Sequence, residues 1–477
     1  MSLVQIAILS AAALLIGWWA PPRLRGPLLL AASLLAIFWL QPQLPVRGLD
    51  FWLPVVSVSL AALTWAITRL PQAEDRRQTR QAALLAAGVI LGLSLLRYAG
   101  PVCCLTASRP PAVLPVIAGL GLVAVLVSLP YFAPRYNRRL AALAILLILA
   151  LFVILKSPPL SVAASAALRT AAGQSAQLAG VGDLLWLGFS YLAFRLLHVL
   201  RDYQAGKLPV YSLGDFLTYA LFFPAYPAGP IDRSQRFIPE VNPAARAKEQ
   251  RVADTLEGGR RILVGAFKKF VVADSLALIA LSPQNALQSS SALWTWVMLL
   301  AYSLRIYYDF SGYTDLAIGI GRLAGFRLPE NFDRPYTRVN LTLFWNSWHM
   351  TLAQWFRAYL FNPLTRWLRS RPQHLPAWLI IFAGQMSTML LIGLWHGITW
   401  NFLIWGAWHG AGLFAHNRWS DWTRPRLAAH PPTPTGQRLL AASGWLLTFL
   451  YVSLGWVWFA LPTPAMAMHT FQVLAGR

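Results

Sequence analysis

The sequence predicts an all-α polytopic integral membrane protein, with about 11 to 13 transmembrane or re-entrant helices. Of its 477 residues, 57% are hydrophobic and only 12% are charged, whereas a typical soluble domain has roughly 25% charged residues. Several uncharged apolar runs have the length of a membrane-spanning helix, among them residues 3–20, 112–129 and 140–155. This composition excludes a soluble enzyme with a soluble cofactor domain, and it excludes a disordered chain.

Six spans are expected in the N-terminal part, at residues 3–20, 27–40, 51–67, 82–96, 112–129 and 140–155. No basic segment precedes the first run, so we interpret it as a span and not as a cleavable signal peptide. The loops after the first, third and fifth spans hold nine arginines, against four lysines and arginines in the other three. The excess predicts that the N-terminus faces outward. We interpret residues 1–160 as a helical scaffold.

The net charge of +23 raises the question of a nucleic-acid partner. Basic residues such as Arg23, Arg76 and Arg138 stand between apolar runs, which is typical of cytoplasmic loops next to anionic lipid. We therefore expect membrane lipids and no nucleic acid as partners, and a multi-pass protein of the plasma (inner) membrane. Cys103 and Cys104 are adjacent, which fits neither a disulfide framework nor a zinc site.

The pattern changes in the second half, where proline, glycine and polar residues interrupt the apolar runs. Residues 221–233 hold three prolines and a glycine in a short apolar stretch, so we expect a broken or re-entrant helix followed by a basic cytoplasmic loop. Irregular backbone at membrane depth is tolerated only inside protein or against a water-filled cavity. We expect residues 184–461 to form the functional core and residues 462–477 a C-terminal tail.

Two histidines in apolar surroundings are the strongest functional candidates. His349 lies in an aromatic stretch, residues 343–361, expected to form an amphipathic helix at the interface, and Gly393 and Gly397 flank His396. Any one histidine beside tryptophan is about as well explained by a place at the headgroup boundary. Two together, separated by an expected hairpin, favour function. The other histidines are expected in loops, at helix ends or on helix faces without a functional role; they are His198, His374, His409, His416, His430 and His469.

Other chemistries lack their motifs. Neither a His-Glu-x-x-His run nor a spaced cysteine pair occurs, which disfavours a metal site. Gly319, Gly321 and Gly325 lack the lysine of a phosphate-binding loop, and no Gly-x-Ser-x-Gly elbow is present. Arg305 and Asp309 are four residues apart, a spacing that permits a stabilising ion pair on one helical face.

The ordered motifs resemble those of the membrane-bound O-acyltransferase family. They are YSLRIYYDFSGYTDLAIGIGRLAGFRLPENFDRPY, then FWNSWHMTLAQWFRAYLF and GLWHG, and the likeness covers about residues 184–461. The branch is that of bacterial alginate O-acetyltransferase membrane subunits and the teichoic acid D-alanyl transfer protein. Paired arginines often precede the first histidine in this branch, where this chain has Asn346 and Ser347.

The resemblance implies transfer of an acyl group, most simply acetyl, from a cytoplasmic thioester to a hydroxyl of a cell-surface polysaccharide or related polymer. It implies His396 as the catalytic base and His349 as a group that orients the acceptor or stabilises the oxyanion. We expect substrate contacts from Trp345, Asn346, Trp395 and Asp309. The co-substrate would be acetyl-CoA or an acyl carrier protein, with no bound cofactor or metal, and an extracytoplasmic transferase could complete the transfer.

Two other classes remain open on the sequence alone. A transporter or flippase could use the buried histidines as a proton relay, because broken helices and polar sites at membrane depth serve transport equally well. A noncatalytic scaffold for a secreted transferase is a third interpretation, although buried histidines would contribute little to it.

Overall fold

The computed structural model describes residues 1–69, 76–99, 105–132, 134–241, 247–372 and 374–477. Within these ranges every regular element is helical and none is a strand, which confirms the all-α prediction. Cys103 and Cys104 lie outside the described residues. The chain forms two compact units, Met1–Leu263 with Asp315–Pro329, and Val264–Thr314 with Glu330–Arg477.

Seven described helical segments are long and apolar enough to cross a membrane, by length and composition. They are Pro22–Leu40, Leu49–Thr68, Arg76–Tyr98, Val113–Phe132, Pro134–Lys156, Ala377–His396 and Pro434–Ala460. Leu3–Trp19 is a shorter apolar helix. All six apolar runs expected in the N-terminal part are therefore helical, and the protein is a multi-pass membrane protein.

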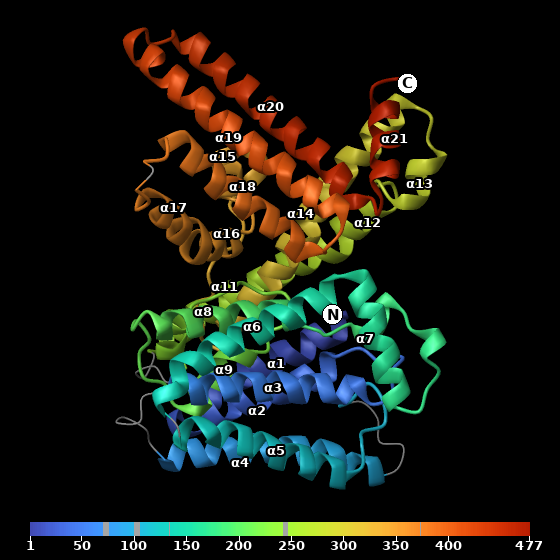
Figure 1. Ribbon diagram of the computed structural model, residues 1–477, viewed down its shortest axis with the longest axis vertical. Coiled ribbons are helices and arrows are strands. Elements are labelled where there is room, and N and C mark those ends of the chain that lie inside the picture. The colour runs from blue at the N-terminus through green and yellow to red at the C-terminus, as the bar shows by residue number, and fades with distance from the viewer. Residues whose placement is uncertain (70–75, 100–104, 133, 242–246, 373) are drawn as a thin grey trace. The chain divides into compact units, whose positions relative to one another are not determined.

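The first unit contains the N-terminal helices (Figure 1). They are α1 (Leu3–Trp19), α2 (Pro22–Leu40), α3 (Leu49–Thr68), α4 (Arg76–Leu95), α5 (Val113–Phe132), α6 (Asn137–Lys156), α7 (Pro158–Ala171), α8 (Phe189–Gln204), α9 (Leu213–Leu221), α10 (Ser234–Phe237) and most of α11 (Lys248–Ala266). Helix α3 packs against α2, α5, α6, α8 and α9. The fully buried rings of Phe51 and Trp65 come from this central helix.

The chain between α9 and α10 is irregular yet buried, as the prolines predict. Helix α9 ends at Leu221, and the next described helix begins at Ser234. Arg195, which is 2% exposed, donates hydrogen bonds to the carbonyl oxygens of Ala220 and Ala225, each at 3.0 Å. Tyr219 donates to the Asp232 carbonyl at 2.9 Å. Side chains thus satisfy backbone groups that a helix would have paired internally.

Close helix contact explains Gly319, one of the glycines that match no phosphate-binding loop. In the first unit, a Cβ on Gly258 of α11 would lie 2.9 Å from the Gly319 carbonyl oxygen, and one on Gly319 would lie 2.8 Å from that of Gly258. Small residues let two helices approach in this way. Arg261 forms an ion pair with Asp315, and Arg322 pairs with Asp254 at 3.0 Å.

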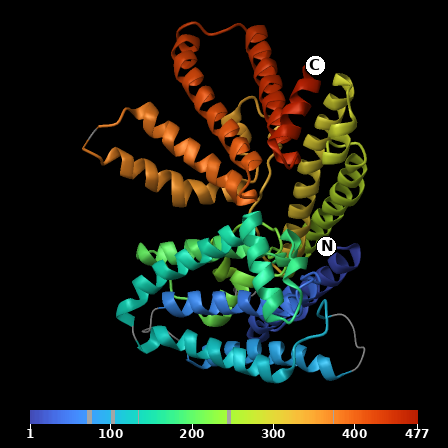
Figure 2. The same cartoon turned by 45° about the vertical axis from the view of Figure 1, so that its right-hand side comes forward.

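The second unit begins with the π-helical segment η7 (Phe267–Ala273), followed by α12 (Asp274–Ala277), α13 (Pro283–Gln288) and most of α14 (Ala292–Leu323). After a loop it continues with α15 (Leu341–Trp345), α16 (Met350–Phe356), the π-helical segment η9 (Arg357–Phe361), α17 (Asn362–Arg369), α18 (Ala377–His396), α19 (Trp400–Ala429), α20 (Pro434–Ala460) and α21 (Pro464–Leu474). Figure 2 shows α19 and α20 as a long hairpin.

The loop after α14 is fastened to two helices of this unit through Tyr336. Its hydroxyl donates to the Ser303 carbonyl of α14 at 2.8 Å and accepts from the Trp456 indole of α20 at 3.0 Å. Helix α14 ends at Leu323, before the first proline of the loop, and Gly325 just beyond its end has a left-handed φ of 86°. The loop then leads the chain into the segment that carries His349. The loop therefore fixes where that segment begins.

Candidate functional site

His349 lies between two short helices and not inside one amphipathic helix. Helix α15 ends at Trp345, α16 begins at Met350, and His349 is the residue immediately before α16. The expected single helix over residues 343–361 is therefore wrong. His349 has φ 42° and ψ 54°, in the left-handed region, which is uncommon for a residue other than glycine. Such backbone strain clusters at functional sites.

Asn331 holds this conformation from the loop after α14. Its side chain is fully buried, and its Oδ1 accepts hydrogen bonds from the Thr351 hydroxyl at 2.6 Å and the Thr351 backbone N–H at 3.3 Å. The same oxygen lies 3.3 Å from Nδ1 of His349. The Asn331 carbonyl oxygen accepts from the Met350 N–H at 2.9 Å. Asn331 is the main residue that sequence reasoning missed.

This network assigns the proton on the imidazole. The backbone N–H of Thr351 can only donate, so the oxygen of the Asn331 amide must face it. Nδ1 of His349 therefore carries the proton that Asn331 accepts, and Nε2 carries the lone pair. His349 lies outside the seven candidate spans, and burial lowers its pKa, which favours a neutral ring.

His396 is the last residue of α18, where the chain turns into α19. Its ring packs against Trp395, Phe402, Trp405 and Phe459, with ring centroids 4.5 to 5.8 Å away. A Cβ on Gly393 would lie 2.2 Å from the Phe402 carbonyl oxygen. Glycine at this position lets α18 and α19 come together beneath His396.

Trp395 links the two histidines. Its ring centroid is 6.0 Å from that of His349 and 4.5 Å from that of His396. Phe310 of α14 contacts the other side of the site, with its ring centroid 4.7 Å from that of His349. Residues from α14, the loop before α16 and α18 therefore converge within the second unit.

Of the remaining predicted contact residues, Trp345 lies near His396, whereas Asn346 and Asp309 contact basic side chains. Trp345 packs against His409 and Trp405, with centroids 5.1 and 5.8 Å apart, and so reaches His396 through Trp405. Asn346 accepts a hydrogen bond from Arg357 at 2.6 Å. Asp309 pairs with Lys269 at 2.5 Å, so the expected pair with Arg305 is wrong. Asp309 is next to Phe310 in the chain, and its ion pair with Lys269 of η7 involves neither histidine.

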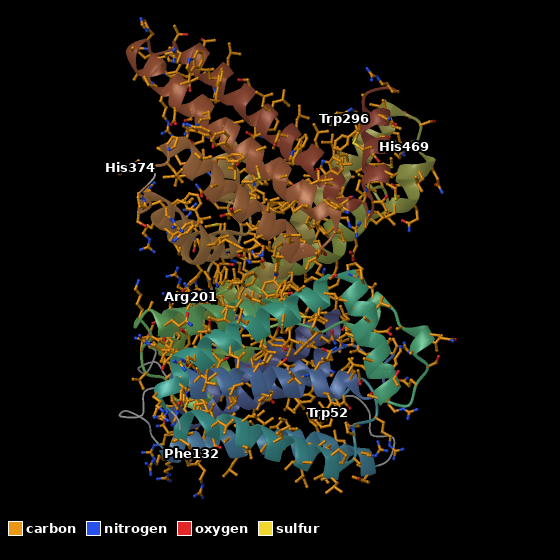
Figure 3. The ribbon with its side chains drawn as sticks, in the orientation of Figure 1. Trp52, Phe132, Arg201, Trp296, His374 and His469 are labelled. Atoms are coloured by element: carbon orange, nitrogen blue, oxygen red, sulfur yellow. The ribbon has the colours of Figure 1, made fainter. Side chains whose placement is uncertain are left out.

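His409 is buried more completely than its sequence context suggests. Its side chain is fully enclosed between Trp345, Trp405 and Tyr451. Neither ring nitrogen has a hydrogen-bond partner among the described residues. His374 lies after α17 and His469 lies on α21, and both are labelled in Figure 3.

No group of three or more histidine, cysteine, aspartate or glutamate side chains could hold a metal ion within the ranges that the structure describes. The side chains described at the site are two imidazoles, the Asn331 amide and an aromatic wall. Such a set can hold a hydroxyl and accept its proton.

Helices of membrane-spanning length, together with two histidines on either side of Trp395, define a membrane protein with a paired-histidine site. The profile of the membrane-bound O-acyltransferase (MBOAT) family matches residues 140–461. The chain belongs to this family.

Several named proteins are similar in sequence to part of this chain. The probable alginate O-acetylase AlgI of Pseudomonas aeruginosa is 34% identical over 292 residues, covering 61% of this chain and 52% of the relative. The peptidoglycan O-acetyltransferase of Helicobacter pylori is 35% identical, with 56% and 48% covered. The teichoic acid D-alanyltransferase of Streptococcus thermophilus is 33% identical, with 50% and 59% covered. The chain thus spans about half the length of these relatives.

Proposed function

We propose that this protein is a membrane-embedded O-acyltransferase of the plasma (inner) membrane. It transfers an acyl group, most simply acetyl, from a cytoplasmic thioester to a hydroxyl of a cell-surface polysaccharide or related polymer, or to a partner protein that completes the transfer. The main support is that His349 and His396 share Trp395 as a neighbour in a chain whose relatives are named as O-acetyltransferases and D-alanyltransferases.

The reaction needs two proton transfers, one from the acceptor hydroxyl to His396 and one from His396 to the leaving thiolate. The acceptor oxygen attacks the thioester carbonyl carbon while His396 takes the hydroxyl proton. The carbon–sulfur bond then breaks, the ester forms, and the protonated His396 returns its proton to the leaving thiolate. His396 ends the cycle neutral, so no cofactor is consumed.

His349 orients the acceptor in this proposal. Because its Nδ1–H donates a hydrogen bond to Oδ1 of Asn331, the Nε2 lone pair of His349 accepts a hydrogen bond from the acceptor hydroxyl. Donation from His349 to an oxyanion would need the opposite tautomer, which the Asn331 amide disfavours. Of the two roles expected from the resemblance, orientation therefore has the better physical support.

The donor is a thioester of coenzyme A or of an acyl carrier protein. The excess of basic residues suits the phosphates of the first and the acidic surface of the second. The proposed partner that delivers the group to the polymer is an extracytoplasmic transferase.

The first test measures thioester turnover and acyl transfer by the purified chain in liposomes, with acetyl-CoA, longer acyl-CoAs and a charged carrier protein. Loss of a general base lowers the rate about 10²- to 10⁴-fold, so His396→Ala should abolish measurable transfer while His349→Ala lowers it strongly. His469→Ala is the matched control because His469 is exposed on α21.

Turnover by His396→Ala at the wild-type rate would overturn the proposed base. If no donor turned over and labelled substrate entered vesicles independently of His396, a transporter or flippase would replace the acyltransferase. Thermal unfolding of each variant in detergent separates loss of chemistry from loss of fold.

A further inference from the structure

A cavity of about 310 Å³ lies within the second unit, beside the segment that leads to His349. Its wall includes Trp345, Asn346, Arg357, Gln385 and Asn417. These residues come from α15 and the turn after it, from η9, and from α18 and α19. A cavity of this size can hold one substrate group.

The electrostatic character of the cavity comes from a single cation. Arg357 lines it, and neither aspartate nor glutamate does. The guanidinium donates to Oδ1 of Asn346 at 2.6 Å, and among the described residues it forms no ion pair. A guanidinium has five N–H donors in a planar fork, so this one bond leaves capacity for a carboxylate or phosphate.

The neighbouring amides also present donors. Oδ1 of Asn346 accepts from Arg357, and Oδ1 of Asn417 accepts from Arg418 at 2.7 Å, which leaves the NH₂ group of each amide as its free end. The Trp345 side chain is 9% exposed, and its N–H has no partner among the described residues. An indole N–H can only donate. The wall also contains one acceptor without a partner among the described residues, Oε1 of Gln385. The positive charge of Arg357, and not a lack of acceptors, is therefore what favours an anion.

The backbone that presents Arg357 is unusual. Arg357 is the first residue of η9, a π-helical segment of five residues between α16 and α17. Single π-helical turns inside α-helices occur frequently at functional sites because they turn a side chain out of the regular helical register. The same turn supplies Phe361 to the cavity wall. Cation and backbone distortion thus coincide at one place.

We propose that this cavity binds an anionic group of a substrate, a carboxylate or a phosphate, through Arg357, Asn346 and Trp345. The proposal deepens the proposed acyltransferase function by assigning a charged subsite next to the His349 segment. Two substrates could carry the anion. One is a thioester donor with phosphates, and the other is an acceptor polymer that contains acidic sugars.

Two matched pairs of probes distinguish these sources. S-acetyl-4′-phosphopantetheine is compared with S-acetylpantetheine, which lacks only its phosphate, and a uronic-acid oligosaccharide is compared with its carboxyl-reduced neutral form. Binding to the full chain in nanodiscs is measured by calorimetry, in the His396→Ala background so that no turnover occurs. In one of the two pairs, the charged probe should bind at least about 10-fold more tightly than its neutral counterpart, because one hydrogen bond to a charged group changes the dissociation constant by about this factor or more.

Arg357→Gln should remove this preference for the charged probe and leave affinity for its neutral counterpart unchanged. Arg369→Gln makes the same charge change at an exposed residue of α17 that does not line the cavity, and it should keep the preference. Asn346→Asp places a carboxylate against Arg357 and should also remove the preference, which provides a second variant if Arg357→Gln fails to fold.

The pair that responds identifies the source of the anion. Equal binding of charged and neutral probes in both pairs would overturn the proposal, as would a preference that survives both Arg357→Gln and Asn346→Asp. The result is independent of catalysis. Anion binding that depends on Arg357, in a protein without transfer activity, would uphold the subsite and reject the proposed function.

Discussion

At the scale of single residues, the site depends on a strained histidine and the amide that holds it. A left-handed backbone at a residue other than glycine costs of order 1 to 3 kcal/mol. His349 keeps this conformation because Asn331 binds its ring and the two following residues. This network orients the ring, whereas the helix expected from the sequence would have placed it in a regular turn.

Asn331→Ala should lower acyl transfer about 10- to 100-fold, the rate equivalent of about 1 to 3 kcal/mol for an orphaned buried hydrogen-bonding group. The loss should fall mainly on kcat, because the ring of His349 is no longer held. Steady-state kinetics in liposomes measures the effect. Asn362→Ala is the control, since Asn362 is exposed and its hydrogen bonds to described residues come from its backbone and not from its side chain.

Asn331→Asp tests the positioning role through pH. A carboxylate beside His349 favours the charged imidazolium, so the acid limb of the pH–rate profile should move to higher pH than in the wild type. Unchanged activity in Asn331→Ala, with an unshifted profile in Asn331→Asp, would show that Asn331 does not position His349.

At the scale of elements, packing against glycine and buried ion pairs fix the arrangement within each unit. Gly393 brings α18 against α19 in the second unit. In the first unit, Arg169 of α7 pairs with Asp183, in the turn before α8, at 2.7 Å, and both side chains are less than 9% exposed. The Ser165 hydroxyl and the Gly180 N–H also donate to this carboxylate.

Asp183→Asn should destabilise the protein by about 3 to 5 kcal/mol, because it leaves the Arg169 charge buried without its counterion. Asp421→Asn is the control, since Asp421 and Arg418 form a pair at the surface whose loss costs about 1 kcal/mol or less. Thermal unfolding in detergent measures both. Equal melting temperatures for the two variants would contradict the structural role of Asp183.

The same pair predicts how stability depends on pH. The hydrogen bond from Arg169 holds the pKa of Asp183 below its usual range. The stabilising contribution is therefore complete above the ordinary carboxyl pKa of about 3.9 and is lost as pH falls through the lower folded value. Between pH 7 and pH 5, the stability difference between wild type and Asp183→Asn should stay constant.

At the scale of the whole molecule, the distribution of basic residues predicts the orientation in the membrane. The predicted arrangement has the N-terminus outside, the loops after the first, third and fifth spans in the cytoplasm, and Cys103 and Cys104 outside. Charge asymmetry determines orientation because basic segments are retained on the cytoplasmic side.

A membrane-impermeant thiol reagent should therefore label the wild-type chain in intact spheroplasts. With Cys103 and Cys104 replaced by serine and Gln78 replaced by cysteine at the exposed start of α4, labelling should require lysis. The reverse pattern would contradict the predicted orientation.

Much of the architecture follows from the sequence alone. Apolar runs give the spanning helices, since hydrocarbon tolerates only segments that satisfy their own backbone. The prolines of residues 221–233 give the break after α9, and the ordered histidine motifs identify the family. These features are local, so a pattern of neighbouring residues is sufficient to determine them.

Tertiary structure alone decided which groups meet at the site. Asn331 lies in a loop, and its partner Thr351 is 20 residues away in the chain. Lys269, the partner of Asp309, is 40 residues away. The sequence pattern instead indicates Arg305, which is close to Asp309 in the chain. The left-handed turn at His349 also needs contacts from another segment to offset its strain. Hydrogen bonds and ion pairs between distant segments depend on how the chain folds back on itself. The periodicity of apolar residues within one helix does not predict which segments meet.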